Sequence, residues 1–295
     1  MFGRRPDGKR LSKLDPIIQI TPYLMPMRCD AQVFLQHNLD YEAMSRYIAA
    51  KSRVGEKITF MQILAASYVR SVSRNPDVNR FIFNKQYYIR NNCSLSYAVL
   101  KDPQDPESNE TTVKIFFDLT DTIFDVRDRM NQAVEGARKT QDGDFVIKLA
   151  KLVLKVPGVP TAVVAVGRLL DRYGLLPGFL VRELPFYCGM FMTNNGSIGL
   201  PGPLHHIYNF GNVSLFIGMG GPKKEAALEA DGRVRMRRWL PIGITADERV
   251  CSGAHYAKFF ADFMYFIAHP EELEQPPEEV WFDNGVEYHV EKPGH

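Results

Sequence analysis

The sequence has little of what marks several common protein classes. Its four cysteines lie far apart without a CxxC pair, which argues against a disulfide framework and against a zinc site of common spacing. Charges nearly cancel, 36 basic against 34 acidic residues, so nothing in the balance demands nucleic acid or a membrane as partner. The apolar run 156–167 contains two prolines and is shorter than the about 20 residues of a spanning helix.

The start of the chain, residues 1–13, is basic and polar and lacks the apolar core of a secretory signal. The sequence also contains no GxSxG elbow, no P-loop and no GxGxxG fingerprint. We therefore expect a cytoplasmic protein with reduced thiols and without a metal. We expect neither nucleic acid nor a membrane as its partner.

Hydrophobic residues make up 45% of the 295 residues, enough for a substantial core. Apolar spacing and capping residues predict helices over residues 40–51, 60–72, 122–136, 161–173 and 254–268. Alternation predicts strands over residues 81–83, 87–89, 94–100, 111–117, 190–194, 214–218 and 240–245, and an extended stretch over 22–34. Helices interleaved with strands indicate an α/β (α+β) domain with an open sheet.

Two segments differ from this pattern. Residues 1–15 form a basic, polar arm, which we expect to be loosely ordered. Residues 145–185 begin with Lys148, Lys151 and Lys155 at helical spacing, among apolar residues. Such a helix has a solvated face in most proteins, but a lysine stripe also suits a neighbouring subunit, a membrane surface or anionic phosphates.

The most informative motif is Asp247-Glu-Arg-Val-Cys-Ser-Gly253, between a predicted strand and a predicted helix. Its Asp-x-Arg-x-x-x-Gly core resembles the C-terminal signature of the acyltransferase (E2) subunits of 2-oxo acid dehydrogenases. It is also similar to that of chloramphenicol acetyltransferases. Those families carry histidine at the second position and aspartate before the glycine, where this sequence has Glu248 and Ser252.

The resemblance continues through most of the chain. Further segments similar to the family, in the same order, are residues 22–30, 59–80, 188–195, 207–218 and 268–272. It implies an acyltransferase-like core over residues 16–275, with 145–185 as a helical insertion and 276–295 as a C-terminal tail. No lipoyl-like segment accompanies this core, so we expect that a partner would carry any swinging arm.

The family likeness also implies a two-layer chloramphenicol acetyltransferase-like fold with a mixed sheet, assembled as a homotrimer or higher oligomer with active sites between subunits. One subunit would supply the 247–253 loop, with Asp247, Arg249, Ser252 and Gly253 as structural motif residues. The other would supply Thr193 or Asn194 to hold an oxyanion, because the family's serine aligns with Asn194. CoA or another thiol would be the acyl carrier, although the sequence assigns no residue to binding it.

The substitutions change the expected chemistry. An unperturbed glutamate titrates about four pH units below a thiol, so Glu248 would need burial to act as the base. Pairing with Arg249 would oppose that role. The pair His205 and His206 offers an alternative, and we take His206 as the outside candidate. Cys251 would be a nucleophile only if a base lowered its pKa.

Two functional hypotheses follow from these residues. The first is an E2-like acyltransferase in which Glu248 acts as base or orienter. The second is a non-catalytic, E2-like trimer that serves as a scaffold or ligand-binding protein, which the loss of both histidine and aspartate from one motif favours.

Overall fold

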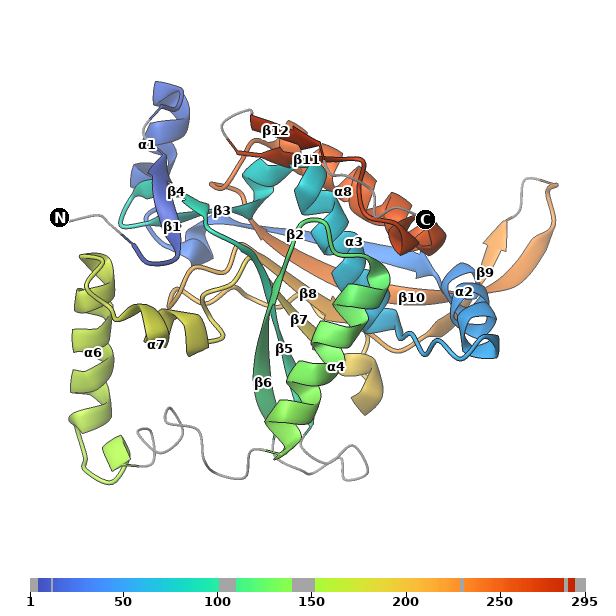
Figure 1. The fold of residues 1–295 in the computed structure, drawn as a ribbon, viewed down its shortest axis with the longest axis horizontal. Coiled ribbons are helices and arrows are strands. Elements are labelled where there is room, and N and C mark those ends of the chain that lie inside the picture. Colours follow the sequence, from blue (N-terminus) through green and yellow to red (C-terminus); the bar gives the residue numbers. More distant parts are fainter. Residues whose placement is uncertain are drawn as a thin grey trace.

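A computed structural model describes residues 5–11, 13–100, 110–139, 152–228, 231–283 and 286–289. Its centre is a seven-stranded mixed sheet (Figure 1). Six strands follow the order β2-β10-β8-β7-β5-β6, and the seventh, β9, pairs with β10. The pairs β5–β7 and β7–β8 are parallel and the others antiparallel. The strands are β2 Gln32–Asp40, β5 Cys93–Leu100, β6 Glu110–Phe117, β7 Met190–Asn194, β8 Leu215–Met219, β9 Lys223–Leu228 and β10 Val234–Asp247.

Four helices cover one face of this sheet: α2 Tyr41–Arg53, α3 Phe60–Arg74, α4 Ile123–Lys139 and α8 Gly253–Ala268. Alternate strand residues such as Met190, Leu215 and Ile244 point into the same core as the buried helix residues Ile63 and Phe263. This two-layer arrangement with a mixed sheet is the predicted fold class, and the prediction is confirmed. The physical reason is that each sheet face and each helix stripe must bury its apolar residues against another element.

The opposite face of the sheet is covered by chain without regular structure. The segment between η3 (Asn195–Ile198) and β8 passes over it, so that Phe191 and Phe216 join a second buried cluster with Ile207. The segment lies very close to the strands, because a Cβ added to Gly218 would meet the carbonyl oxygen of Pro203 at 2.7 Å. The missing side chain of Gly218 therefore allows the backbone of the covering segment to approach the strand closely.

The beginning of the chain is more ordered than the sequence predicted. Within the expected loose arm, β1 (Gly8–Leu11) pairs with β4 (Gln86–Arg90), which also pairs with β3 (Arg80–Phe83). Arg5 is buried and forms ion pairs. The arm was mispredicted because a three-stranded sheet formed by residues far apart in the sequence leaves little local signal.

The predicted extended stretch 22–34 is also partly wrong. α1 (Pro16–Leu24) includes its beginning, and η1 (Arg28–Ala31) precedes β2. Asp15 caps α1 by accepting from the Ile17 N–H at 2.8 Å, and Pro16 occupies a favoured first-turn position. Pro22 lies inside this helix, at a position where a proline normally ends or kinks a helix.

Other local predictions agree with the structure. Asp40 caps α2 and Thr59 caps α3, each through its side-chain oxygen. Asn84 and Lys85 form the turn between β3 and β4 with positive φ values of 45° and 61°. These values are typical of the two-residue turn of a tight hairpin.

The predicted insertion contains α6 (Val159–Arg172) and α7 (Gly178–Glu183), while Lys148 and Lys151 lie outside the described residues. α6 stands apart from the helices of the main sheet (Figure 1), and its residues Val163, Val166 and Leu169 are exposed. Near the C-terminus η4 (Pro270–Glu274), β11 (Glu279–Phe282) and β12 (Val286–His289) follow. Val280 of β11 is buried, so this part of the expected tail packs on the domain.

Candidate active site

The centre of the 247–253 motif is a buried ion pair at the end of β10. Arg249 donates from Nε to Asp247 Oδ1 at 2.8 Å and from Nη2 to Oδ2 at 2.7 Å, a bidentate pair. A second guanidinium, that of Arg28, has its Nε 3.5 Å from Asp247 Oδ2. All three side chains are at most 5% exposed. Asp247 and Arg249 therefore fix the loop that follows the strand.

Two buried guanidinium groups share this one carboxylate. Burial lowers the pKa of Arg28 to about 10, against the attraction of Asp247. Burial also acts to lower the pKa of Arg249, but the hydrogen bonds that Arg249 donates to Asp247 and the negative charge of Asp247 outweigh burial, so that this pKa is raised. Arg28 and Arg249 together carry one positive charge more than the Asp247 carboxylate neutralises.

Glu248 points away from this pair. Its backbone N–H donates to the carbonyl of Ala31 at 2.9 Å, while its side chain is exposed and makes no hydrogen bond within the described part of the chain. Arg249 pairs with Asp247 and not with Glu248, so the pairing that would have opposed a base role does not form.

The rest of the motif begins α8. Ser252 is the N-cap, accepting from the His255 N–H at 3.4 Å, and Gly253 is the first helical residue. Tyr256 in the first turn donates its hydroxyl to the carbonyl of Asp247 at 2.8 Å. Cys251 is buried and burial raises its pKa, which leaves its thiol protonated and unsuited to nucleophilic attack.

Thr193 and Asn194 lie at the other end of the sheet. Asn194 pairs with Met219 of β8, and Met219 in turn pairs with Ile242 of β10, so Asn194 and Ile242 lie at the same height in the sheet. Glu248 lies six residues after Ile242, beyond the end of β10. At about 3.3 Å per residue this is a separation of roughly 20 Å along the strand direction. A single chain thus does not bring Glu248 to Thr193 or Asn194.

The two histidines lie on the covering layer of the sheet. His205 stacks on Phe216 with ring centroids 4.1 Å apart, and its Nδ1 is 2.7 Å from the carbonyl oxygen of His206. His206 is exposed and contacts Tyr208 edge to face. The carbonyl of Tyr208 accepts from Arg28 at 2.8 Å, which places this segment beside the Asp247 end of the sheet.

His255, at the start of α8, has a carboxylate partner. Its Nδ1 contacts Asp77 Oδ2, while the imidazole remains largely exposed. Sequence reasoning did not identify this contact, because Asp77 and His255 are far apart in the chain. It likewise missed Arg28, whose contact with Asp247 is equally distant in sequence.

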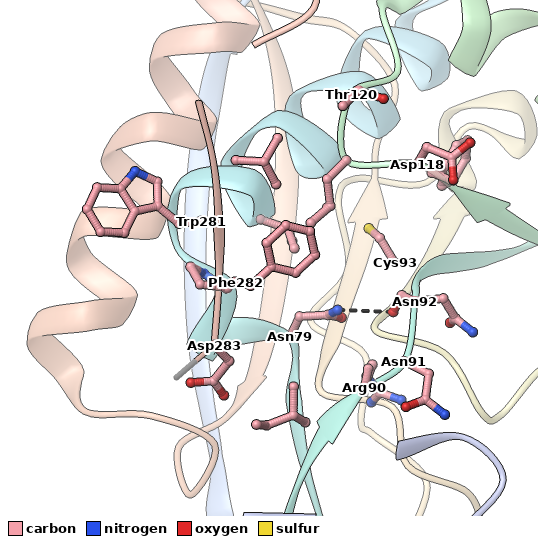
Figure 2. Close-up of a pocket in the computed structure, with 16 residues that line it drawn as sticks. Asn79, Arg90, Asn91, Asn92, Cys93, Asp118, Thr120, Trp281, Phe282 and Asp283 are labelled. Atoms are coloured by element: carbon pink, nitrogen blue, oxygen red, sulfur yellow. Dashed lines mark hydrogen bonds between the residues drawn. The ribbon is translucent and has the colours of Figure 1, made fainter. Parts of the chain in front are cut away.

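A cavity of about 480 Å³ lies elsewhere, between β5, η2 (Pro76–Asn79) and β11 (Figure 2). Its wall includes Cys93, whose pKa burial raises to about 12, and Asn79, which donates to the carbonyl of Asn92 at 3.1 Å. None of the predicted site residues lines it. This cavity therefore does not coincide with the site predicted from the sequence.

Across the described ranges there is no group of three or more His, Cys, Asp or Glu residues that could hold a metal ion. Within the same ranges no helix is both long and apolar enough to cross a membrane.

Comparison with known proteins agrees with this fold. The sequence model for the catalytic domain of the 2-oxoacid dehydrogenases acyltransferase family matches residues 190–274, which include β7, β8, β10 and the 247–253 motif. A probable dihydrolipoamide acetyltransferase from Listeria monocytogenes is similar over 90% of this chain and 96% of its own, with a TM-score of 0.55 and 12% identity. The chain has the fold of the E2 acyltransferase catalytic domain.

Two further structures share this E2-like fold. The cubic core of the pyruvate dehydrogenase multienzyme complex is similar over 89% of this chain and 93% of its own chain, at 13% identity and a TM-score of 0.53. Chloramphenicol acetyltransferase covers 88% of this chain with 99% of its own, at 11% identity and a TM-score of 0.53. No curated protein sequence is significantly similar to the chain. At these identities the likeness establishes the fold, and the chemistry must be argued from the residues.

Proposed function

We propose that this E2-like domain is an acyltransferase that moves an acyl group to or from CoA or another thiol at a site between subunits. The observation that carries the proposal is the motif geometry. A buried bidentate pair of Asp247 and Arg249 holds residue 248 outward at the end of β10, within the segment that matches the acyltransferase family.

The need for a second subunit follows from the strand registers. Glu248 and Asn194 lie at opposite ends of the sheet of one chain. A homotrimer, as the family resemblance implies, would bring the 247–253 loop of one copy against the Thr193 and Asn194 end of another. Exposed apolar residues on the projecting β9–β10 hairpin, Leu228, Val234 and Met236, support association between copies (Figure 1).

Catalysis would then depend on how the neighbour covers Glu248. Burial against another subunit disfavours the charged form of a carboxyl and makes it a stronger base. Glu248 would take the proton of the acceptor thiol, and the thiolate sulfur would attack the carbonyl carbon of the donor thioester. The tetrahedral oxyanion would accept hydrogen bonds from the Asn194 amide or the Thr193 hydroxyl. As the donor carbon–sulfur bond breaks, Glu248 would return the proton to the leaving thiolate.

A second candidate function is a non-catalytic, E2-like trimer that acts as a scaffold or ligand-binding protein. It is favoured by the solvent exposure of Glu248, whose carboxylate has no hydrogen-bond partner in the part of the chain that the structure describes. Within the acyltransferase proposal, His206 is the outside candidate for the base, because it is exposed in the segment whose Tyr208 carbonyl contacts Arg28.

Activity and assembly must be measured on the same variant to separate the two candidates. CoA release from acetyl-CoA would be followed with a panel of thiol acceptors, and mass measured by light scattering. The acyltransferase proposal predicts that Glu248→Gln loses turnover by at least about 10²-fold, the usual contribution of a general base. The matched control Glu42→Gln removes an exposed carboxylate on α2 and should keep full activity. Unchanged turnover in Glu248→Gln would refute the role of this residue, and no CoA binding at millimolar concentration would favour the scaffold.

A further inference from the structure

A basic pocket of about 360 Å³ lies on the far side of the motif, between η1, the β3–β4 turn and the C-terminal end of α6. Five cationic side chains and one carboxylate line it: Arg28, Lys85, Arg168, Arg172, Arg249 and Asp171. Arg168 and Arg172 come from the segment that the sequence predicted to be an insertion. The pocket thus joins this segment to the arginines around the motif.

The carboxylates near the pocket neutralise its cations only in part. Asp171 Oδ1 accepts from Arg5 at 2.8 Å and its Oδ2 accepts from the Tyr187 hydroxyl. The Asp247 carboxylate behind the wall is already shared by Arg28 and Arg249. Asp30 contributes a favourable charge to Arg249, but it does not line the pocket.

Several donors around the pocket have unused capacity. Arg168 is exposed and has no hydrogen-bond or ion-pair partner in the described ranges, and Arg172 uses only its Nε, which donates to Asn84 Oδ1 at 3.2 Å. Lys85 lies over the ring of Tyr23 at 4.8 Å, and its ammonium has no ion-pair partner among the residues that the structure describes. Arg28 adds its charge to the pocket wall, while its Nε faces Asp247 at 3.5 Å without a hydrogen bond among the described residues.

We propose that this pocket binds the phosphate or diphosphate group of a ligand. A fully desolvated guanidinium that shares its counter-ion is costly unless a further anion approaches. Guanidinium forks bind phosphate oxygens in pairs, and a lysine adds a point charge. Several guanidinium groups around one small pocket fit a multiply charged phosphate better than a single carboxylate.

The site does not depend on the proposed acyl transfer, because it rests on its own lining residues. Its wall nevertheless includes Arg249, the residue next to Glu248. The phosphate group has two possible sources, a phosphate-containing acyl carrier or a free phosphorylated ligand. Competition between probes distinguishes them.

Calorimetric titration with inorganic pyrophosphate at low ionic strength tests the site on the full chain. Saturable binding is expected, and the double variant Arg168→Gln, Arg172→Gln should bind at least about tenfold more weakly, which corresponds to about 1.4 kcal/mol. Because Arg168 is exposed, the single variant Arg168→Glu should also weaken binding without affecting the fold. Arg46→Gln removes an exposed arginine on α2 and is the matched control, with less than about twofold change.

If CoA competes with pyrophosphate in the wild type, and the double variant no longer binds CoA, the site is supported and an acyl carrier is the source of the phosphate. Binding of pyrophosphate without competition by CoA would support it with a free phosphorylated ligand. Absence of saturable binding, or equal loss of affinity in Arg46→Gln and in the pocket variants, would overturn the proposal, because both results mean non-specific attraction of anions. The loss of turnover in Glu248→Gln is a separate measurement on a residue outside this pocket, so this proposal and the proposed function can fail separately.

Discussion

Because Arg28 and Arg249 share the carboxylate of Asp247, we predict that its removal strongly lowers the free energy of unfolding. Asp247→Asn keeps the size of the side chain but removes its charge, which leaves Arg249 and Arg28 as uncompensated cations. The carboxylate is 2% exposed and the two guanidinium groups 4% and 5%. Removing one partner of a buried ion pair costs about 3–5 kcal/mol, because the remaining charge stays desolvated. At roughly 2–4 °C per kcal/mol, the melting temperature should fall by roughly 6–20 °C.

The assay is urea and thermal unfolding at pH 7 with the protein concentration held constant, since association changes apparent stability. Asp231→Asn provides the control, because it makes the same substitution in an exposed pair with Arg235 at 3.5 Å. That variant should lose less than about 1 kcal/mol. A loss below about 1 kcal/mol for Asp247→Asn would refute the view that this carboxylate compensates two buried charges.

A double-mutant cycle gives a second check on the same reasoning. Arg28→Met removes one of the two cations and leaves a side chain of similar length. If Asp247 and Arg28 interact as the 3.5 Å separation indicates, the double variant should be more stable than the sum of the single losses predicts. Additive losses would show that Arg28 and Asp247 are not coupled.

Two other predictions concern titration and reactivity. Burial lowers the pKa of Lys114 to about 8 while its Nζ donates to the carbonyl of Val181 at 2.8 Å, so the unfolded chain binds more protons above pH 8 and stability should rise with pH between about 8 and 10.5. Urea unfolding over this range should show that rise in the wild type and lack it in Lys114→Met; parallel pH profiles would contradict the assignment. Of the four cysteines only Cys29 is exposed, so a thiol reagent should label one site rapidly and three only on unfolding. Cys29→Ser should abolish the rapid phase, and rapid labelling that persists in this variant would show that a buried thiol opens.

Much of the secondary structure could be predicted from sequence because its causes are local. Asp40 and Thr59 mark helix starts through their own side-chain oxygens, and apolar spacing predicts α3 and α8. The hairpin around Asn84 and Lys85 likewise depends on neighbouring residues. α1 was not predicted, and its internal Pro22 is a residue that normally argues against the middle of a helix.

Only part of the candidate site could be predicted from the sequence. The motif predicted the position of the 247–253 loop, but not which residues would pair inside it. Arg249 had Glu248 and Asp247 as adjacent carboxylates, and the turn after β10 directs it to Asp247 while Glu248 faces outward. The roles of Glu248, Thr193 and Asn194 stay predictions.

By itself the sequence determined most helices and most strands, because periodicity, capping and turn residues act between near neighbours. The two-layer class with a mixed sheet followed from the motif and its resemblance to a known family. Only the tertiary structure decided what lies around the motif. Arg28 meets Asp247, Arg168 and Arg172 join the same basic pocket, and Asn194 lies far from Glu248 in the chain's own sheet. These relations depend on strand order and register between segments far apart in the chain, and such pairings leave no periodic signal in the residues that make them.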